Sequence, residues 1–172
     1  MIGGRRRKTV IRRGHGFTLV ELMIVLVVMA VLLGIAVPSM TQFTFSGKLR
    51  AYSNEVVASA VLARSEAIKR NQVVTLCVST NGTSCVSGSW ESGWIVLTTG
   101  GEVVHRQQPI TDGFKVIGTV DRIDFQASGV GSTIATLKIC RASPSLGDKE
   151  SEVTISATGR TAVERKASSS CS

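Results

Sequence analysis

The sequence is poor in histidine, tyrosine, tryptophan and cysteine. Its 172 residues include two His, one Tyr, two Trp and four Cys. A catalytic metal centre built from several histidines would need His15 and His105 together, and nothing in the sequence places them near each other. Four cysteines are too few for a disulfide-stapled miniprotein. The three prolines and 17 glycines follow no G-X-Y period, which excludes a collagen-like chain.

Sets of catalytic side chains are also missing. We find no Ser-His-Asp or Cys-His set, and Gly129-Val130-Gly131 lacks the helix and lysine of a phosphate-binding loop. If residues 121–126 are extended, Asp121 and Asp124 point to opposite faces, which argues against a paired-carboxylate site. The sequence therefore predicts a protein that is not an enzyme, with no catalytic residue, metal, cofactor or small-molecule substrate.

Acidic residues are absent from the start of the chain. Residues 1–16 hold six of the 20 Lys and Arg residues and none of the 12 Asp and Glu residues. Without this basic arm the chain would carry only 14 − 12 = +2 of net charge. The net charge of +8 therefore reflects the arm, and it is poor evidence for nucleic-acid binding.

Charge is nearly absent from the next segment, residues 17–40, where Glu21 is the only charged residue. A helix of this length would span about 36 Å, enough to cross a bilayer. Three interpretations compete: a buried core helix, a cleaved secretory signal, and a membrane helix kept in the mature protein. A buried core helix fits poorly with the basic arm beside it. A cleaved signal fits poorly with Glu21 inside the apolar run and with Pro38 near the cleavage point. We favour the third, with the arm cytoplasmic and a single pass to the far side.

Residues 14–25 read GHGFTLVELMIV: a Gly, then Phe-Thr-Leu, one residue, a Glu and a long apolar run. This stretch resembles the N-terminal signature of type IV pilins and type II secretion pseudopilins. The resemblance implies that prepilin peptidase removes the leader, residues 1–16, by cutting between Gly16 and Phe17, and that Phe17 is then N-methylated. It also implies that Glu21 serves filament assembly by pairing with a neighbour's mature N-terminus. Alternatively, Glu21 lies at the headgroup level, where the helix dipole favours an anion.

The rest of the chain predicts an α+β fold. Apolar residues recur at helical spacing to about Arg70: Leu49, Tyr52, Val56, Ala60, Ala63 and Ala67. Short β-branched segments punctuated by Gly, Asn and Ser follow and predict an antiparallel sheet system. They are Val73–Val78, Gly93–Leu97, Val103–Arg106, Phe114–Ile117, Ile123–Gln126, Thr136–Arg141 and Glu152–Ser156. The expected fold is pilin-like. Its long N-terminal helix is transmembrane or in the filament core over residues 17–40. The helix is then amphipathic to about residue 70 and packs on a C-terminal antiparallel β-sheet. This second part of the helix and the sheet form a domain of residues 41–172.

Later motifs narrow the resemblance to the GspH and FimT branch. They are RSEAIKR at 64–70, VVTLC at 73–77, GWIVL at 93–97 and ISATGR at 155–160, and we expect Trp94 to lie in the core. The branch contains minor pilins and minor pseudopilins, placed at or near the filament tip, which prime assembly. The resemblance implies a minor pilin of a type IV pilus, first in the inner membrane with a periplasmic domain and then in the pilus. Its partners would be other major and minor pilins. The alternative is a minor pseudopilin of type II secretion.

Cysteine usage agrees with export. Cys77 and Cys85 flank the Asn81-Gly82 turn, which suits a local disulfide and would leave Cys140 and Cys171 for a second bridge. Four cysteines allow three connectivities, and the sequence does not fix one rigorously. We favour this pairing, because it leaves no strained alternative and staples the C-terminal segment. A zinc site is the alternative, but no CxxC pair supports it. Disulfides would fit an oxidising periplasm.

The C-terminal segment offers a second alternative function. Some members of the branch bind DNA for uptake through a C-terminal Gly-Arg-x-Arg element. Here Gly159-Arg160 is present, but Ala162 stands at the second Arg position. Arg165 and Lys166 follow and could contact phosphates in a weak, salt-dependent way. Five basic residues of the helix could extend this patch: Lys48, Arg50, Arg64, Lys69 and Arg70. The competing interpretation is a solvated last hairpin held by Cys171.

Overall fold

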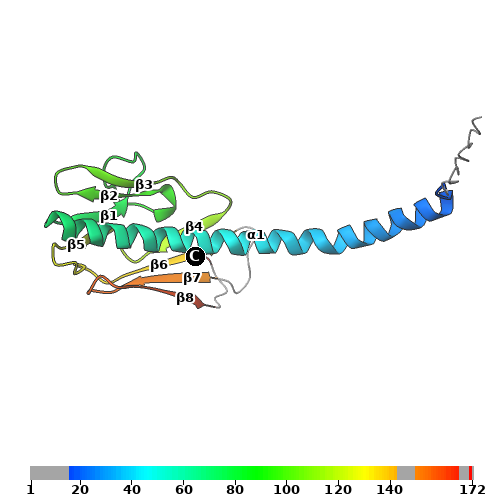
Figure 1. Ribbon diagram of the computed structural model, residues 1–172. Coiled ribbons are helices and arrows are strands. Elements are labelled where there is room, and N and C mark those ends of the chain that lie inside the picture. Colours follow the sequence, from blue (N-terminus) through cyan, green and yellow to red (C-terminus); the bar gives the residue numbers. More distant parts are fainter. Residues whose placement is uncertain (1–15, 143–149, 167–170, 172) are drawn as a thin grey trace, which may run out of the picture. The chain divides into compact units, whose positions relative to one another are not determined.

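The computed structural model describes residues 16–142, 150–166 and 171, without the side chains of residues 36–39, 41 and 42. The chain divides into two compact units between Met40 and Thr41. A single helix, α1 (Leu19–Arg70), begins in the first unit and ends in the second (Figure 1). The remaining described elements are antiparallel strands and a short 3-10 helix, all in the second unit. The pilin-like α+β fold expected from the sequence is thus confirmed.

The start of α1 is set by a local capping motif. Thr18 precedes the helix, and its Oγ1 accepts a hydrogen bond of 3.2 Å from the Glu21 backbone N–H. A Thr cap followed three residues later by Glu is the pattern of a capping box, which satisfies backbone N–H groups at a helix start. Glu21 also lies in the first turn, where the helix dipole favours a negative charge.

The described part of the first unit is an apolar helix with exposed side chains. Every large apolar side chain from Phe17 to Ile35 is exposed. Within the part of the chain that the structure describes, no helix is identified with the length and apolar character needed to cross a membrane. The structure thus does not identify the membrane span that the sequence predicts over residues 17–40.

The second half of α1 buries one face against the folded domain. Five apolar side chains of its inner face are buried: Leu49, Val56, Ala60, Ala63 and Ala67. Tyr52 packs edge-on against Phe114, with 5.3 Å between ring centroids. The helix ends at Arg70 because Asn71 adopts a left-handed conformation with φ of 50°. Backbone bonds from Asn71 to the Ile68 carbonyl and from Gln72 to the Ala67 carbonyl then close the last turn. The predicted face and helix end are confirmed.

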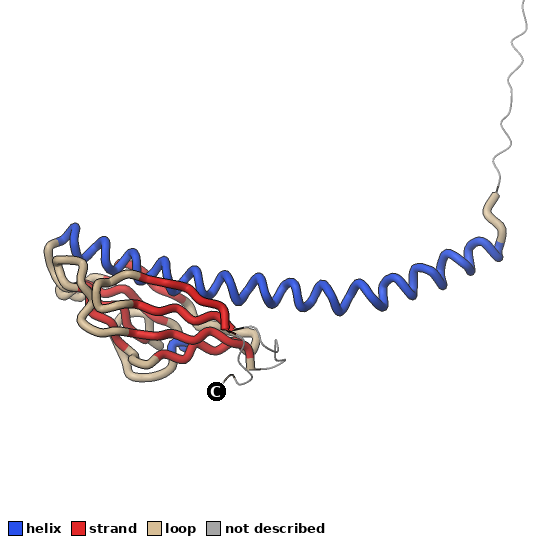
Figure 2. Tube along the Cα trace, turned by 90° about the horizontal axis from the view of Figure 1, so that it is seen from below, coloured by secondary structure: helices blue, strands red, loops and turns tan. Residues whose placement is uncertain are grey.

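Within the described residues, eight strands form two four-stranded sheets. The first sheet has the order β3 (Val103–Gln107), β2 (Trp94–Thr98), β1 (Val74–Val78) and β5 (Arg122–Phe125). The second has the order β4 (Phe114–Gly118), β6 (Ala135–Arg141), β7 (Glu150–Ile155) and β8 (Thr161–Lys166). A short 3-10 helix, η1 (Trp90–Ser92), precedes β2. Figure 2 shows the strands gathered along the second half of α1.

One hydrophobic core lies between the inner face of α1 and both sheets. Its fully buried members come from the helix and from strands of each sheet, such as Leu76, Trp94 and Ile123 in one and Leu137 and Ile155 in the other. Trp94 donates a 2.9 Å hydrogen bond from its indole Nε1–H to Ser59 Oγ on α1. This confirms the core role expected for Trp94. A buried indole with its N–H satisfied fixes the helix against β2.

The strand segments expected from the sequence all coincide with strands, within one or two residues. Strand β8 is not among the segments expected from the sequence. It carries the charged run Glu164-Arg165-Lys166 and lacks apolar alternation. It forms because every residue of β7 finds a partner in it, from Glu150–Lys166 to Ile155–Thr161. Strand pairing with a neighbour, rather than the local pattern, defines this edge strand.

Two disulfides close the domain. Cys77 pairs with Cys85 and Cys140 pairs with Cys171, with 5.6 Å between the Cα atoms of each pair. This confirms the connectivity favoured from the sequence over the zinc alternative. The second bridge attaches Cys171 to β6. Cys140 lies at the same end of the second sheet as Lys166 of β8.

We expect the two disulfides to contribute unequally to stability. Loop-entropy reasoning gives roughly 3.7 kcal/mol for the Cys140–Cys171 bridge and roughly 2.5 kcal/mol for Cys77–Cys85, because the closed loops are long and short respectively. Urea unfolding of residues 41–172 in two variants, Cys140→Ser with Cys171→Ser and Cys77→Ser with Cys85→Ser, measures both losses. A smaller loss for the long loop would contradict this ranking.

Candidate functional site

The N-terminal residues singled out by the sequence lie at an open, accessible end. Phe17 is 80% exposed, and a Cβ added to Gly16 would meet no atom within 4 Å. The fold therefore gives no reason for a glycine at residue 16. A processing enzyme that binds an extended backbone at the bond after residue 16 would instead explain why this residue is a glycine. The cleavage, the methylation of Phe17 and the assembly role of Glu21 stay predictions.

Exposed apolar surface continues from this end along α1. Side chains on all sides of the helix are exposed from Phe17 to Ile35, and Glu21 is the one acidic residue among them. A contiguous apolar surface of this extent marks a site of burial by lipid or protein. The arrangement is suited to insertion into an apolar environment rather than to catalysis.

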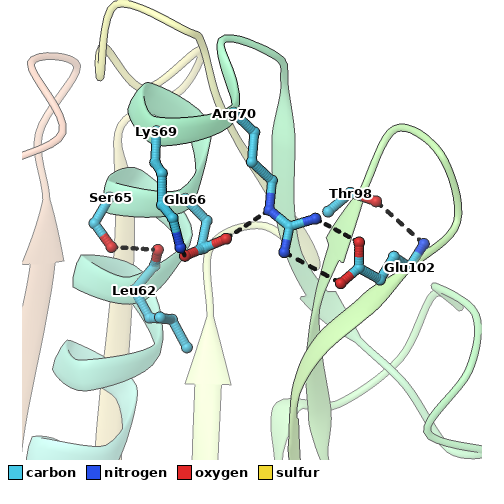
Figure 3. Close-up of polar contacts among 7 residues, drawn as sticks. All are labelled: Leu62, Ser65, Glu66, Lys69, Arg70, Thr98 and Glu102. Carbon is cyan, nitrogen blue, oxygen red and sulfur yellow. Dashed lines mark hydrogen bonds and ion pairs between the residues drawn. The ribbon is translucent and has the colours of Figure 1, made fainter.

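The motif RSEAIKR at residues 64–70 is an ion-pair network that fixes the end of α1 (Figure 3). Arg70 Nε donates to Glu66 at 2.5 Å, while the other nitrogens of its guanidinium bind Glu102 in the turn between β2 and β3. Lys69 also contacts Glu66, at 3.3 Å. The hydrogen bonds from Arg70 hold the pKa values of Glu66 and Glu102 below their ordinary values. The network ties the helix to the first sheet.

This network makes stability sensitive to acid. A carboxyl whose pKa is lowered by folding stabilises the fold above its ordinary pKa of 4.5, and that contribution is lost as pH falls through the lowered value. We therefore expect the urea midpoint to fall more between neutral pH and a pH below 4.5 in the native domain than in Arg70→Met. Equal falls in both proteins would contradict a stabilising role for the network.

The motif ISATGR at residues 155–160 is the turn between β7 and β8. Gly159 has a φ of 73°, and its N–H donates to the Ser156 carbonyl at 2.8 Å. A Cβ at residue 159 would lie 2.4 Å from the Gly129 carbonyl oxygen and 3.1 Å from Arg64 Nε. Gly131 N–H also donates to the Ala157 carbonyl at 3.0 Å. The glycine of this motif thus lets the turn pack directly against the loop at Gly129 and against α1.

Replacing Gly159 by Ala should destabilise the domain by more than about 2 kcal/mol. The left-handed conformation alone costs an L-residue about 1–2 kcal/mol, and the contact with the Gly129 carbonyl adds to it. Gly101→Ala is the matched control, because Gly101 also has a positive φ of 83° but has open space around it. Equal losses in urea unfolding would show that the packing at Gly159 is unimportant.

The residues predicted for DNA binding are exposed but do not form one cluster. Arg160 lies at the β7–β8 turn, whereas Arg165 and Lys166 lie at the other end of β8, about five residues or 17 Å away. Cross-strand partners share a face, so Arg165 opposite Ser151 and Lys166 opposite Glu150 are on different faces of the sheet. Lys166 Nζ also binds Glu152 at 2.6 Å, which raises its pKa.

The expected extension of this patch along the helix is also reduced. Lys69 and Arg70 are engaged by Glu66, and Lys48 binds Asp112. Arg50 and Arg64 form no ion pair with any residue that the structure describes. Of these, Arg64 reaches the β7–β8 turn, where Arg160 is the next residue after Gly159. The pairing of Arg64 with this turn was missed, because helical spacing alone does not show which loop a helix meets.

Comparison with known proteins gives the family. Residues 53–159 match the family model described as type II transport protein GspH, and residues 11–37 match the prokaryotic N-terminal methylation motif. No curated protein matches the chain significantly in sequence. The solved structures that resemble it are all pilus or secretion subunits.

Two of these structures are crystal forms of the Pseudomonas aeruginosa type IV minor pilin FimU. The first has a TM-score of 0.58 and 22% identity, covering 76% of this chain and 99% of FimU. The second has a TM-score of 0.57 and 23% identity, covering 72% and 100%. The minor pseudopilin EpsH of the Vibrio cholerae type 2 secretion system has a TM-score of 0.50 and 14% identity, covering 68% and 96%. The fold is therefore that of minor pilins and minor pseudopilins, and the chain, matched over more than half its length, belongs to the family of type II transport protein GspH.

Proposed function

We propose that this protein is a minor pilin of a type IV pilus, made as a prepilin and built into the filament at or near its tip. Prepilin peptidase removes residues 1–16 between Gly16 and Phe17, and the new N-terminal Phe17 is methylated. The apolar part of α1 holds the subunit in the inner membrane, with the domain of residues 41–172 in the periplasm. The subunit then enters the filament and helps to prime its assembly with other minor pilins.

The observation that carries the proposal is the apolar surface of α1, which is exposed on all sides. The helix starts with the Thr18–Glu21 cap, directly after the accessible Gly16–Phe17 bond. The match of residues 11–37 to the methylation motif supports the same interpretation. Glu21 has no acidic or basic neighbour in the first turn of α1. We propose that its carboxylate pairs with the α-ammonium group of a neighbouring subunit's Phe17, because two opposite charges in an apolar filament core attract strongly.

A minor pseudopilin of type II secretion is the second candidate. The family model carries that system in its description, and EpsH shares the fold. The identity to FimU, 22%, exceeds that to EpsH, 14%, and favours the pilus assignment. Both candidates use the same N-terminal chemistry, so the fold alone does not separate them.

Deletion of the gene in the native host separates the two functions. The pilus assignment predicts that surface pili, counted by electron microscopy, fall sharply and return with a plasmid copy, while secreted enzyme activity stays unchanged. Normal piliation with accumulation of exoproteins in the periplasm would instead assign the chain to type II secretion. Complementation by the Glu21→Gln variant, tested in the same strain, connects the phenotype to the N-terminal helix.

A further inference from the structure

The Asn81-Gly82 turn lies inside the loop that the Cys77–Cys85 disulfide closes, and Asn81 is exposed there. The chain has three asparagines, Asn54, Asn71 and Asn81, and only Asn81 is followed by a glycine. The backbone nitrogen of the next residue can attack an asparagine side-chain amide, and a glycine obstructs this attack least because it has no Cβ. Among the three asparagines, Asn81 is therefore the one whose sequence most favours this reaction.

The backbone nitrogen of Gly82 is bonded to a hydroxyl group. Its N–H donates a 3.0 Å hydrogen bond to Ser79 Oγ. The nitrogens that follow the other two asparagines are instead held in helical hydrogen bonds, since Glu55 lies within α1 and the Gln72 N–H donates to the Ala67 carbonyl at 3.2 Å. A hydroxyl can accept a proton and pass on its own, whereas a carbonyl oxygen has no proton to pass on. Only the Gly82 nitrogen among these three has such a partner.

The side-chain carbonyl of Asn81, which would be attacked, accepts three hydrogen bonds. The backbone N–H groups of Thr83 and Ser84 donate to its Oδ1 atom at 2.9 and 3.0 Å. The Ser79 hydroxyl donates to the same oxygen at 3.1 Å. Donors directed at a carbonyl oxygen stabilise the negative charge that develops there when a nucleophile adds to the carbon. The turn therefore surrounds Oδ1 as an oxyanion hole does.

Ser79 contacts both reacting groups, which gives the proton a path between them. Its oxygen accepts the Gly82 N–H, and its own O–H donates to Asn81 Oδ1. As the Gly82 nitrogen adds to Asn81 Cγ, its proton can move to Ser79 Oγ while the Ser79 proton moves to Oδ1. The nitrogen that must leave, Asn81 Nδ2, lies 2.9 Å from Ser84 Oγ. Each atom that gains or loses a proton in the reaction thus has a hydroxyl partner in the turn.

The surroundings of the turn also favour a carboxylate product. Ser79, Asn81, Gly82 and Arg106 line a polar cleft of about 130 Å³, which has room for water. Arg106 lies over the turn, since a Cβ at Gly82 would be 3.4 Å from Arg106 Cδ. Arg106 forms no ion pair with any residue that the structure describes. A carboxylate formed at residue 81 would therefore be attracted to a guanidinium that no acidic side chain in the described structure neutralises.

We propose that Asn81 is a self-modification site, at which the turn itself converts the asparagine to aspartate and isoaspartate. The Gly82 nitrogen bonds to Asn81 Cγ, the Cγ–Nδ2 bond breaks, and ammonia leaves a cyclic succinimide. Water then opens the ring at either of its carbonyls, which gives aspartate or isoaspartate. In sum, one side-chain amide and one water become one carboxylic acid and one ammonia. Ser79 transfers the proton, and the product adds one negative charge beside Arg106.

The test incubates the purified full-length protein in detergent at neutral pH for several days and follows each asparagine by peptide mass spectrometry. Asn54 and Asn71 are internal controls, because both are exposed but neither precedes a glycine. We expect Asn81 to convert at least about tenfold faster than either, which corresponds to about 1.4 kcal/mol in activation free energy. An isoaspartate-specific methyltransferase should label residue 81, since opening of the succinimide gives isoaspartate as well as aspartate.

Ser79→Ala tests the proton path. It removes the hydroxyl from both reacting groups and should slow conversion by at least about tenfold, since positioned proton transfer contributes about 10²–10⁴-fold. Ser87→Ala is the matched control, because Ser87 is exposed nearby but takes part in none of these contacts. The native chain in urea with both disulfides reduced keeps the Asn-Gly sequence and loses the turn. It should also convert more slowly than the folded chain, and this comparison does not depend on how the Ser79 variant folds.

The opposite outcomes overturn the inference. The hydrogen bonds of the turn would protect Asn81 if they only held its side chain in place. Three results would show such protection: an Asn81 amide that persists as long as those of Asn54 and Asn71, faster conversion in the unfolded chain than in the folded one, or a folded Ser79→Ala variant that converts as fast as the native chain. None of these measurements involves pili, so failure of this inference leaves the proposed function untouched.

Discussion

Replacing Gly16 with Phe should block removal of residues 1–16 while leaving the folded domain unchanged. The structure has open space at Gly16, so a larger side chain disturbs no packed contact. The peptidase must bind this residue beside the bond it cuts, and a bulky side chain obstructs an extended backbone there. We expect cleavage to slow by at least tenfold, or about 1.4 kcal/mol in activation free energy. The mass of the membrane-associated chain, with or without the leader, measures this directly.

Gly47→Phe is the matched control for this experiment. Gly47 also lies in open space, but it is far along α1 from the cleavage bond. Its cleavage should match that of the native chain. Normal processing of Gly16→Phe, or impaired processing of both variants, would contradict a specific requirement for a small residue before Phe17.

Glu21→Gln should leave processing intact and strongly reduce incorporation into the filament. The amide keeps the size of the side chain and the backbone bond from residue 21 to Thr18, but it removes the negative charge. An ion pair at about 4 Å in surroundings of effective dielectric constant 20 is worth about 4 kcal/mol, so its loss should lower incorporation by more than tenfold. Quantitative immunoblotting of the sheared pilus fraction against the membrane fraction measures the ratio.

Thr18→Ala separates the charge from the helix cap. It removes the Oγ1 that accepts the Glu21 N–H bond but keeps the carboxylate. The lost cap costs about 1 kcal/mol of helix stability at an exposed terminus, so incorporation should stay close to that of the native chain. If Thr18→Ala reduced incorporation as much as Glu21→Gln, the role of Glu21 would lie in starting the helix and not in pairing with a neighbour.

Much of the fold follows from local sequence, because the signals are strong and independent of distant contacts. The apolar spacing from Leu49 to Ala67 predicts the inner face of α1, and the turn at Asn81 and Gly82 predicts the Cys77–Cys85 bridge. Once those two cysteines pair, Cys140 and Cys171 remain for each other. Strand β8 is different. Its exposed charged residues carry no β pattern, and only the free edge of β7 makes it a strand.

The candidate contacts of the second unit could not be predicted for the same reason. The sequence grouped Arg160 with Arg165 and Lys166 by proximity along the chain, whereas the register of β7 and β8 puts them at opposite ends of a strand. The turn that holds Arg160 packs through Gly159 against Arg64 of α1, nearly a hundred residues earlier. That neighbour depends on two glycines, Gly129 and Gly159, whose close approach lets the turn meet the helix. Neither glycine signals this approach by itself.

The most direct test of the central claim is intact-mass analysis of this protein recovered from pili sheared off the native host. The proposal predicts a chain that begins at Phe17, carries one added methyl group on its N-terminal amine, and retains both disulfides. A chain that still carries residues 1–16, or one that is absent from the pili of a piliated strain, would contradict its assignment as a minor pilin.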